Sequence, residues 1–443
     1  MKKTHRPIIA IAATLLLHSL SYAQSFNQAK MDSLFSALES KDKAMGSICI
    51  RQNGKEIYRR SMGYSFADLQ KKAGASTKYR IGSITKMFTA TMVLQLAEEK
   101  KIDLAAPLAR YFSRVPNAAK ITIRQMLQHH SGIHNFTDDE AYQGYMQQTK
   151  SEAEMLDIIV KGGSDFEPGT KGAYSNANYV LLGYIVEKVT KKPYAKALQE
   201  RVCSKAGLKN TYMGGKAEAA KDESRSYEYR NGWQLMPETD MSIPGGAGGI
   251  VSTPGDLGLF IEALFAGKLI SIASLELMKT MQDDYGLGMF VFPFDDKRAY
   301  GHNGGIDGFS SLLGYIPADK LAFAYCGNGS SSFSTNDIAI GALSILYNKP
   351  YVIPAFNTIT VSTEQLDRYT GTYSSKQLPL KITISKEGAT LVAQATGQSA
   401  FPLEATATDQ FRFDAAGIVL EFKPDQKEMT LKQGGGTFLF TRE

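Results

Sequence analysis

The sequence contains only three cysteines, Cys49, Cys203 and Cys326, and no two of them are close together. An odd number at this spacing excludes a disulfide-stapled scaffold and leaves at least one thiol free, and all three can simply be small core residues. There is no long basic run with interleaved aromatics, so a nucleic-acid partner has no support. Beyond the first 23 residues, no segment is long and apolar enough to span a bilayer. What remains is a chain of 443 residues, which is long enough for two domains.

The first 23 residues are typical of a secretory signal peptide. Lys2, Lys3 and Arg6 form a positive start, an apolar run at 8–17 is too short to span a bilayer well, and 21–23 offers small residues for cleavage. An uncleaved membrane anchor is the alternative, whereas a lipid anchor is not favoured because no cysteine follows the run. Cleavage would lower the formal net charge from +6 to +3, since it removes these three basic residues and no acidic one. We expect a periplasmic or extracellular protein without stable membrane insertion.

Ser83 and Lys86 stand three residues apart at the start of an apolar stretch that extends to Ala97. Positions i and i+3 share one face of a helix, so the lysine amine can reach the serine hydroxyl at the first turn of a buried helix. A serine hydroxyl is a weak nucleophile until a base removes its proton, and a buried lysine loses its own proton more readily. The helix N-terminus adds partial positive charge where an oxyanion would form. The same spacing recurs at Ser40 and Lys43, but in a polar stretch with no buried helix after it.

A second candidate segment is Tyr174-Ser175-Asn176, which lies between a Pro-Gly turn and an apolar helix. A tyrosine hydroxyl can relay a proton, and an asparagine amide can both donate and accept hydrogen bonds. The alternative is a loop tyrosine beside an asparagine that caps the helix.

A third candidate is His302-Asn303-Gly304-Gly305. Glycines let a substrate lie against the backbone of a strand, and a histidine there can donate a hydrogen bond or shuttle a proton. The alternative is a structural histidine beside a cluster of turn glycines.

Two other kinds of site find little support. A Ser-His-Asp hydrolase would usually show Gly-x-Ser-x-Gly on a strand-to-helix turn, and the sequence has none. His129, His130 and His134 could suggest a metal site, but there is no His-Glu-x-x-His motif. We therefore expect neither a metal nor another cofactor.

Together the three segments resemble the serine β-lactamase-like superfamily, most closely its branch of class C β-lactamases, D-alanyl-D-alanine carboxypeptidases and esterases. The motifs of that family are Ser-x-x-Lys, then Tyr-x-Asn, then Lys/His-x-Gly, and they occur here in this order at Ser83–Lys86, Tyr174–Asn176 and His302–Gly304. Flanking segments of the family are matched as well, at residues 123–133, 167–170 and 245–253. The resemblance covers roughly residues 30–348.

The resemblance implies a role for each residue. Ser83 is the nucleophile that forms an acyl-enzyme, and Lys86 and Tyr174 share the duties of general base and general acid. Asn176 orients Lys86 and the substrate amide or ester. The backbone N–H groups of Ser83 and Gly305 form the oxyanion hole.

The third motif departs from the Lys-Thr-Gly form that helps to hold the carboxylate of penicillins. His302 replaces the lysine and Asn303 the hydroxyl residue, while Gly304 is kept. We therefore expect hydrolysis of small esters or of D-amino acid amides and peptides to exceed that of β-lactams. The alternatives are a β-lactamase, or a penicillin-binding or sensing protein without turnover. The oligomeric state is left open.

The expected architecture is α/β (α+β): the β-lactamase/transpeptidase-like fold, an antiparallel sheet flanked by helices with a mostly helical subdomain. We place this hydrolase domain at 24–349 and a linker at 350–363. Short alternating strands at 364–443 predict a small antiparallel barrel or sandwich, which resembles a lipocalin-like β-domain. Within the hydrolase domain, Asn53-Gly54 predicts a hairpin turn. The other predicted elements are helices at 27–38, 180–189 and 336–347, and strands at 47–51, 56–62 and within 314–325.

Overall fold

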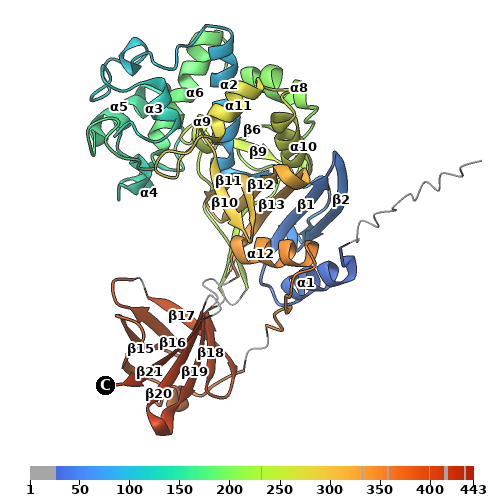
Figure 1. Cartoon of the computed structure of the whole chain (residues 1–443), viewed down its shortest axis with the longest axis vertical. Helices are drawn as coiled ribbons and strands as arrows, with labels where there is room; N and C mark the ends of the chain where they lie inside the picture. Colours follow the sequence, from blue (N-terminus) through green and yellow to red (C-terminus); the bar gives the residue numbers. More distant parts are fainter. Residues whose placement is uncertain are drawn as a thin grey trace, which may run out of the picture.

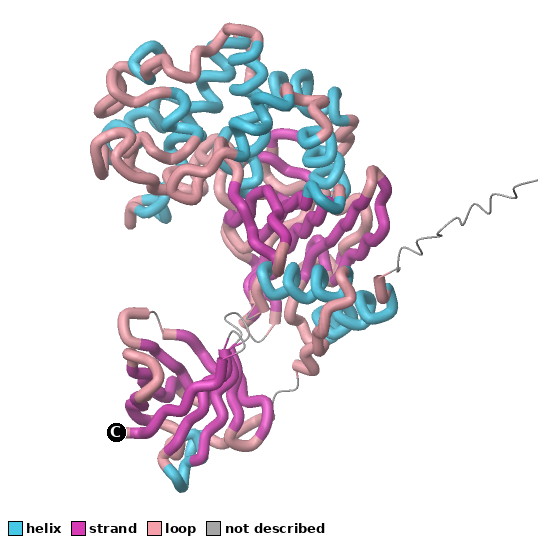
Figure 2. The backbone as a smooth tube through the Cα atoms, viewed as in Figure 1, coloured by secondary structure: helices cyan, strands magenta, loops and turns pink. Residues whose placement is uncertain are grey.

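The computed structural model describes residues 26–443, except 231, 332, 357–358, 399, 414–417 and 434–435. The predicted signal peptide at 1–23 lies outside the described residues. The molecule has a large part made of helices and strands, and a small part made almost wholly of strands (Figure 1, Figure 2). In the described part of the chain, no helix is both long and apolar enough to cross a membrane.

The large part is built on an antiparallel sheet with the strand order β10-β11-β12-β13-β1-β2. The bounds of these strands are β1 Met45–Gln52, β2 Lys55–Met62, β10 Phe290–Phe294, β11 Lys297–Ile306, β12 Phe309–Ile316 and β13 Leu321–Ser330. The sheet thus joins the first strands of the chain to strands that follow more than two hundred residues later. The predicted hairpin is confirmed, because Asn53 and Gly54 both have positive φ, 52° and 78°, as a tight two-residue turn requires. A short hairpin of β7 (Tyr227–Tyr229) and β8 (Trp233–Leu235) extends from β13.

Helices cover both faces of this sheet, and alternate residues of β13 separate the two cores. Phe323 and Tyr325 pack under α1 (Gln28–Ser40) and α12 (Thr335–Leu346), whereas Ala324 and Cys326 join the core on the opposite face. Figure 1 shows α1 and α12 side by side at the same face. All three cysteines are buried and unpaired.

The opposite core surrounds α2 (Thr85–Glu98), in which every residue from Thr85 to Leu96 is buried. This burial on all sides confirms the prediction from the apolar run. The ring of Phe88 stacks on Phe260 of α10 (Pro254–Phe265) at a centroid distance of 3.8 Å. The remaining helices of the large part are α3 Ile123–Leu127, α4 Tyr142–Tyr145, α5 Glu152–Gly162, α6 Asn176–Thr190, α7 Tyr194–Leu198, α8 Ser204–Ala206, α9 Gly245–Gly248 and α11 Ile272–Lys279.

The small part is a closed antiparallel barrel, which decides between the two architectures expected from the sequence. Its strands are β14 Gly371–Ser374, β15 Lys381–Glu387, β16 Thr390–Ala395, β17 Phe401–Ala407, β18 Gln410–Phe413, β19 Ile418–Lys423, β20 Glu428–Gln433 and β21 Gly436–Arg442. Its interior is filled by inward-facing apolar residues such as Leu391, Leu420 and Phe440. The short helix α13 (Thr363–Leu366) precedes the first strand.

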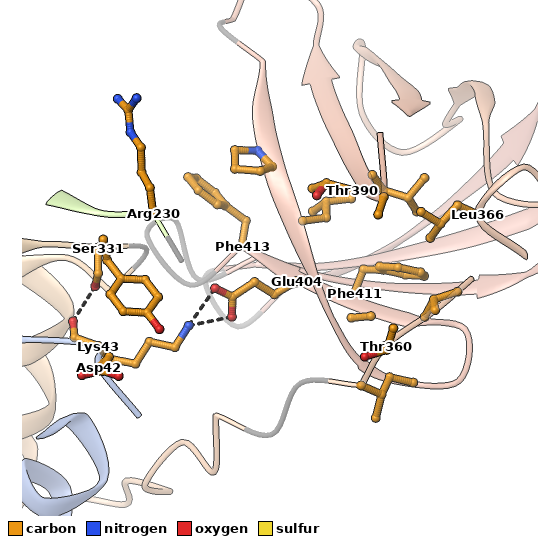
Figure 3. A pocket seen from close by; sticks show the side chains of 18 of the residues that line it. Asp42, Lys43, Arg230, Ser331, Thr360, Leu366, Thr390, Glu404, Phe411 and Phe413 are labelled. Atoms are coloured by element: carbon orange, nitrogen blue, oxygen red, sulfur yellow. Dashed lines mark hydrogen bonds and ion pairs between the residues drawn. The ribbon is translucent and has the colours of Figure 1, made fainter. Parts of the chain in front are cut away.

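The two parts meet at a hollow of about 950 Å³ (Figure 3). Across it, the ammonium group of Lys43 lies 2.7 Å from both carboxylate oxygens of Glu404 on β17. The backbone N–H of Ile359 donates to the carbonyl of Ala405, at 2.9 Å, and adds a second tie. Lys43 belongs to the second Ser-x-x-Lys match, at Ser40, and its side chain therefore forms an ion pair that joins the two parts of the molecule.

Candidate active site

The amine of Lys86 reaches the hydroxyl of Ser83, as their spacing predicts, but the helix begins slightly later than predicted. Ser83 is in a short 3₁₀ turn, Gly82–Ile84, and α2 itself starts at Thr85. The Nζ atom of Lys86 lies 3.0 Å from the Oγ atom of Ser83. Lys86 is fully buried, and desolvation holds the pKa of its amine well below the ordinary value of 10.5. A neutral amine has a lone pair, so this lysine can act as a base.

Asn176 fixes the amine of Lys86 from the other side. Its Oδ1 accepts from Nζ at 2.8 Å, while the carbonyl of Ala247 accepts at 2.9 Å. The Nδ2 group of Asn176 donates to Oδ1 of Asn135 and Oγ1 of Thr137, at 3.2 and 3.1 Å. The amide is thereby oriented with its acceptor toward the lysine. Asn176 opens α6 without capping it through its side chain, so the alternative of a simple helix cap is wrong.

Tyr174 completes the surroundings of the serine hydroxyl. Its OH group donates to Oγ of Ser83 at 2.8 Å. Burial raises the pKa of Tyr174 above its ordinary value, so the phenol is protonated and acts as a donor. The Oγ atom of Ser83 is thus held between a neutral amine, that of Lys86, and a phenol.

His302 faces this group from β11 but is neutral. Its ring is almost fully buried, lies 4.5 Å from the ring of Phe290 and 6.4 Å from that of Tyr174, and its Nδ1 is 2.5 Å from the carbonyl oxygen of Asn303. Desolvation by burial lowers the pKa of His302 to about 3. No fixed positive charge therefore stands at the position of the family's lysine.

The side chain of Asn303 does not accompany that of His302. Successive side chains of a strand point to opposite faces of the sheet. Asn303 accordingly lines a separate cavity of about 250 Å³, which it shares with Asn336 and Ile340 of α12. It does not line the cleft that contains Ser83.

The glycines of the third motif allow β11 to lie directly against the serine segment. A Cβ atom on Gly304 would lie 2.0 Å from the carbonyl oxygen of Ile81, so no larger residue fits. A Cβ atom on Gly82, which has φ of +50°, would lie 2.8 Å from the backbone nitrogen of Gly305. The backbone of Gly305 therefore runs beside the segment of Ser83, and an oxyanion hole formed by their N–H groups stays a prediction.

Ser83, Asn176 and Gly305 line one cleft of about 360 Å³. Its other walls are largely apolar, with Phe136, Tyr142, Met146, Met236, Ile243 and Ile306 among them. Among the described residues that line it there is no lysine or arginine, and none comes from the barrel. The cleft therefore offers apolar surface and, among its described lining residues, no positively charged side chain.

One buried ion pair beside the cleft escaped the sequence analysis. Arg80 contacts the carboxylate of Asp307 at 2.9 Å, and the hydroxyl of Thr239 donates to the same carboxylate at 2.6 Å. These contacts join the strand before Ser83 to the turn after Gly305 and to the cleft wall. In the sequence, Arg80 stands close to Ser83 and Asp307 close to Gly305, and this was the signal that could have indicated the ion pair. An arginine or an aspartate by itself, however, does not indicate which residue it pairs with.

The three neighbouring histidines have separate partners. His130 contacts Asp283 at 3.0 Å, and His134 contacts Asp139 and Asp165 at 3.0 and 2.9 Å. His129 turns inward and stacks on the ring of Tyr174. In the described ranges, no three His, Cys, Asp or Glu side chains are arranged to hold a metal ion.

Comparison with known proteins identifies the family and the fold. A model of the beta-lactamase family matches residues 31–345. The teichoic acid D-alanine hydrolase of Staphylococcus aureus is 26% identical over 315 residues, which cover 69% of this chain and 76% of that protein. The structure of D-amino acid amidase from Ochrobactrum anthropi SV3 superposes with a TM-score of 0.63 at 26% identity, over 72% of this chain and 99% of the amidase.

A penicillin-binding protein homologue from Pyrococcus abyssi has a TM-score of 0.68 at 24% identity. The match covers 94% of this chain and all of that one, so the likeness in fold extends beyond the hydrolase part. The antiparallel sheet with its flanking helices is accordingly the β-lactamase/transpeptidase-like fold, followed by a small all-β domain. The chain belongs to the beta-lactamase family and is a serine hydrolase.

Proposed function

We propose that this protein is a secreted hydrolase that cleaves small esters or D-amino acid amides and peptides through an acyl-enzyme on Ser83. The observation that carries the proposal is the position of the Ser83 Oγ atom. It lies 3.0 Å from Nζ of Lys86 and 2.8 Å from the hydroxyl of Tyr174, at an open cleft. A nucleophile within reach of a base and of a proton donor is the arrangement that covalent catalysis needs.

In the first half of the reaction, the neutral amine of Lys86 takes the proton of Ser83 as Oγ forms a bond to the substrate carbonyl carbon. The carbonyl oxygen becomes an oxyanion, which the backbone N–H groups of Ser83 and Gly305 stabilise. When the carbon–oxygen or carbon–nitrogen bond breaks, Tyr174 gives its proton to the leaving group and regains one from Lys86. The products of this half are the acyl-enzyme and a free alcohol or amine.

In the second half, a water molecule replaces the leaving group. It transfers a proton to the neutral amine of Lys86 as its oxygen attacks the acyl carbon. The bond between the acyl carbon and Oγ of Ser83 then breaks, and the serine regains its proton. No separate carboxylate base is assigned to this step, in keeping with the Tyr-x-Asn motif.

The cleft supports the choice of substrate. A β-lactam carries a carboxylate, and this cleft offers it neither a lysine nor an arginine among the described lining residues. His302 is neutral as well, since its pKa is about 3. Ester and amide groups lose nothing by this lack of charge. The names of two relatives, a teichoic acid D-alanine hydrolase and a D-amino acid amidase, support D-amino acid esters and amides as the first compounds to test.

Export is part of the proposal and rests on residues 1–23, with their basic start and apolar run. Fractionation of producing cells should place the protein in the periplasm or the medium, with a mature N-terminus at Gln24. Full-length protein in the membrane fraction would favour the uncleaved anchor instead.

Labelling with a fluorophosphonate, followed by intact-protein and peptide mass spectrometry, tests the chemistry. We expect one adduct, on Ser83, and none in Ser83→Ala. Ser40→Ala is the matched control, because Ser40 belongs to the other Ser-x-x-Lys match and its hydroxyl donates to the carbonyl of Ala37 in its own helix. Labelling that survives Ser83→Ala would refute the assignment. A penicillin adduct that forms on Ser83 without any turnover of esters, amides or peptides would identify a sensor instead of an enzyme.

A further inference from the structure

We propose that His129 is a positioning residue, which holds the hydroxyl of Tyr174 against Ser83. The inference rests on the proposed acyl-enzyme function and assigns a role to a residue outside the three motifs. His129 follows α3 and is buried beside the segment that carries Tyr174. Three separate contacts join His129 to the segment 173–175.

Two of these contacts hold the backbone on either side of the tyrosine. The N–H group of Ala173 donates to the carbonyl oxygen of His129, at 2.9 Å. The N–H group of Ser175 donates to Nδ1 of the same histidine, at 3.1 Å. The residues before and after Tyr174 are therefore both bonded to His129, so the tyrosine backbone is fixed from both ends.

The third contact holds the tyrosine ring. The rings of His129 and Tyr174 are stacked, with centroids 4.4 Å apart and planes 27° from parallel. The phenol hydroxyl then reaches the Oγ atom of Ser83 at 2.8 Å. A rotation of the tyrosine ring would break this hydrogen bond, and the stacked imidazole opposes it.

His129 can make these contacts only as a neutral imidazole. Nδ1 must be unprotonated to accept from Ser175, so Nε2 carries the proton. Nε2 is buried and has no hydrogen-bond partner among the described residues, and burial lowers the pKa of His129 well below its ordinary value. The backbone of His129 also has φ of 58°, a left-handed conformation that residues other than glycine rarely adopt.

Two substitutions separate the contacts. His129→Asn keeps a side-chain acceptor near the position of Nδ1 but removes the stacked ring, and His129→Phe keeps a ring but removes the acceptor. His134→Gln is the matched control, since His134 belongs to the same segment but its side chain bonds to Asp139 and Asp165. Each variant is compared with the wild type at a temperature below its own measured unfolding temperature. The quantities measured are the rate of fluorophosphonate labelling and kcat and KM with one ester substrate.

We expect both His129 variants to lower kcat by at least about tenfold with little change in KM, and His134→Gln to match the wild type. The decisive measurement repeats both substitutions in Tyr174→Phe, which has no hydroxyl left to position. There each should change kcat by less than about twofold, because residues that act as a unit are not additive.

Equal losses of kcat in the wild-type and Tyr174→Phe backgrounds would overturn the proposal, because His129 would then act on the protein as a whole. Labelling of the His129 variants at the wild-type rate would also overturn it while leaving the proposed function intact. A variant that does not unfold cooperatively is treated as unfolded, and the other variant then decides. If neither variant folds, His129 is needed for the fold and the proposal is rejected. A wild-type protein that is not labelled at all would reject the proposed function, and this inference with it.

Discussion

The Nζ atom of Lys86 and the Oδ1 atom of Asn176 lie 2.8 Å apart, and the lysine is completely buried. The asparagine offers a neutral acceptor, so it orients the amine without adding a negative charge that would favour the ammonium form. Desolvation can then keep the pKa of Lys86 low. The absence of charge on the Asn176 amide thus helps to keep the pKa of Lys86 low, while the position of the amide orients the amine.

Asn176→Asp should move the pH dependence of the reaction. A carboxylate at 2.8 Å stabilises the ammonium form and raises the pKa of Lys86, so the base becomes protonated at neutral pH. We expect kcat/KM to fall at neutral pH and to recover at higher pH, so that the acidic limb of its pH profile shifts to higher pH. Asn176→Ala, which brings no charge, is the control and should lower activity without this upward displacement. An unchanged limb in Asn176→Asp would mean that Lys86 is not the titrating base.

Lys86→Ala and Tyr174→Phe should each reduce turnover far more than substrate binding. Both side chains exchange protons with the reacting atoms, and such groups contribute about 10²–10⁴-fold to the rate. The loss should therefore appear in kcat, with KM nearly constant, in steady-state assays with an ester substrate. A variant that keeps nearly the wild-type kcat would show that its residue has no part in proton transfer.

Lys86→Met should alter how stability depends on pH. Between the lowered pKa of buried Lys86 and the ordinary value of 10.5, the unfolded chain binds a proton that the folded protein does not. The free energy of unfolding of the wild type should therefore rise with pH, relative to that of Lys86→Met, by up to about 1.4 kcal/mol per pH unit in this window. Denaturant unfolding at neutral and at moderately alkaline pH measures the difference. Parallel stability curves would indicate that Lys86 is charged in the folded protein.

The order of kcat/KM among substrates should reflect the lack of a lysine or arginine among the described residues of the cleft. A charge-assisted hydrogen bond contributes roughly 1.5–3 kcal/mol, so a β-lactam carboxylate that lacks one loses tenfold or more in affinity. We expect kcat/KM for p-nitrophenyl esters or D-amino acid amides, which lack such a carboxylate, to exceed that for nitrocefin, and D-Ala-D-Ala peptides are assayed beside them. Ser83→Ala provides the background rate for each compound. A nitrocefin value above all of the others would reverse the ranking and support a β-lactamase.

The C-terminal barrel should be dispensable for acylation. None of its described residues lines the cleft of Ser83, and the large part has its own two cores. A chain that ends at Val361 should therefore still be labelled on Ser83 by the fluorophosphonate, provided that circular dichroism shows a folded product. A folded, soluble truncation without any labelling would mean that the barrel builds part of the site.

Much of the site could be predicted because its residues occur in short motifs. The spacing of Ser83 and Lys86 determines their approach on a helical turn, and an apolar run can only be a buried helix or strand. The hairpin at Asn53-Gly54 and the helices at 27–38, 180–189 and 336–347 follow from similarly local patterns and are confirmed, within a few residues at their ends. The division into 24–349, 350–363 and 364–443 stays a prediction.

What could not be predicted depends on contacts between distant segments. The stacking of His129 on Tyr174 joins residues that lie 45 positions apart, and no local pattern records it. The cavity that Asn303 shares with α12 likewise involves a segment outside its motif, because neighbouring residues of a strand face opposite sides of the sheet. Lys43 likewise had no visible partner until the fold brought Glu404 to it.

The closure of the barrel limits how other molecules can reach this domain. Because β14 pairs with β21, each of its strands has a neighbour on both sides. An open sheet leaves unpaired N–H and C=O groups at its edges, to which a foreign peptide can add as a further strand. The barrel offers no such edge in its described strands, so a protein partner would have to recognise its side chains or loops.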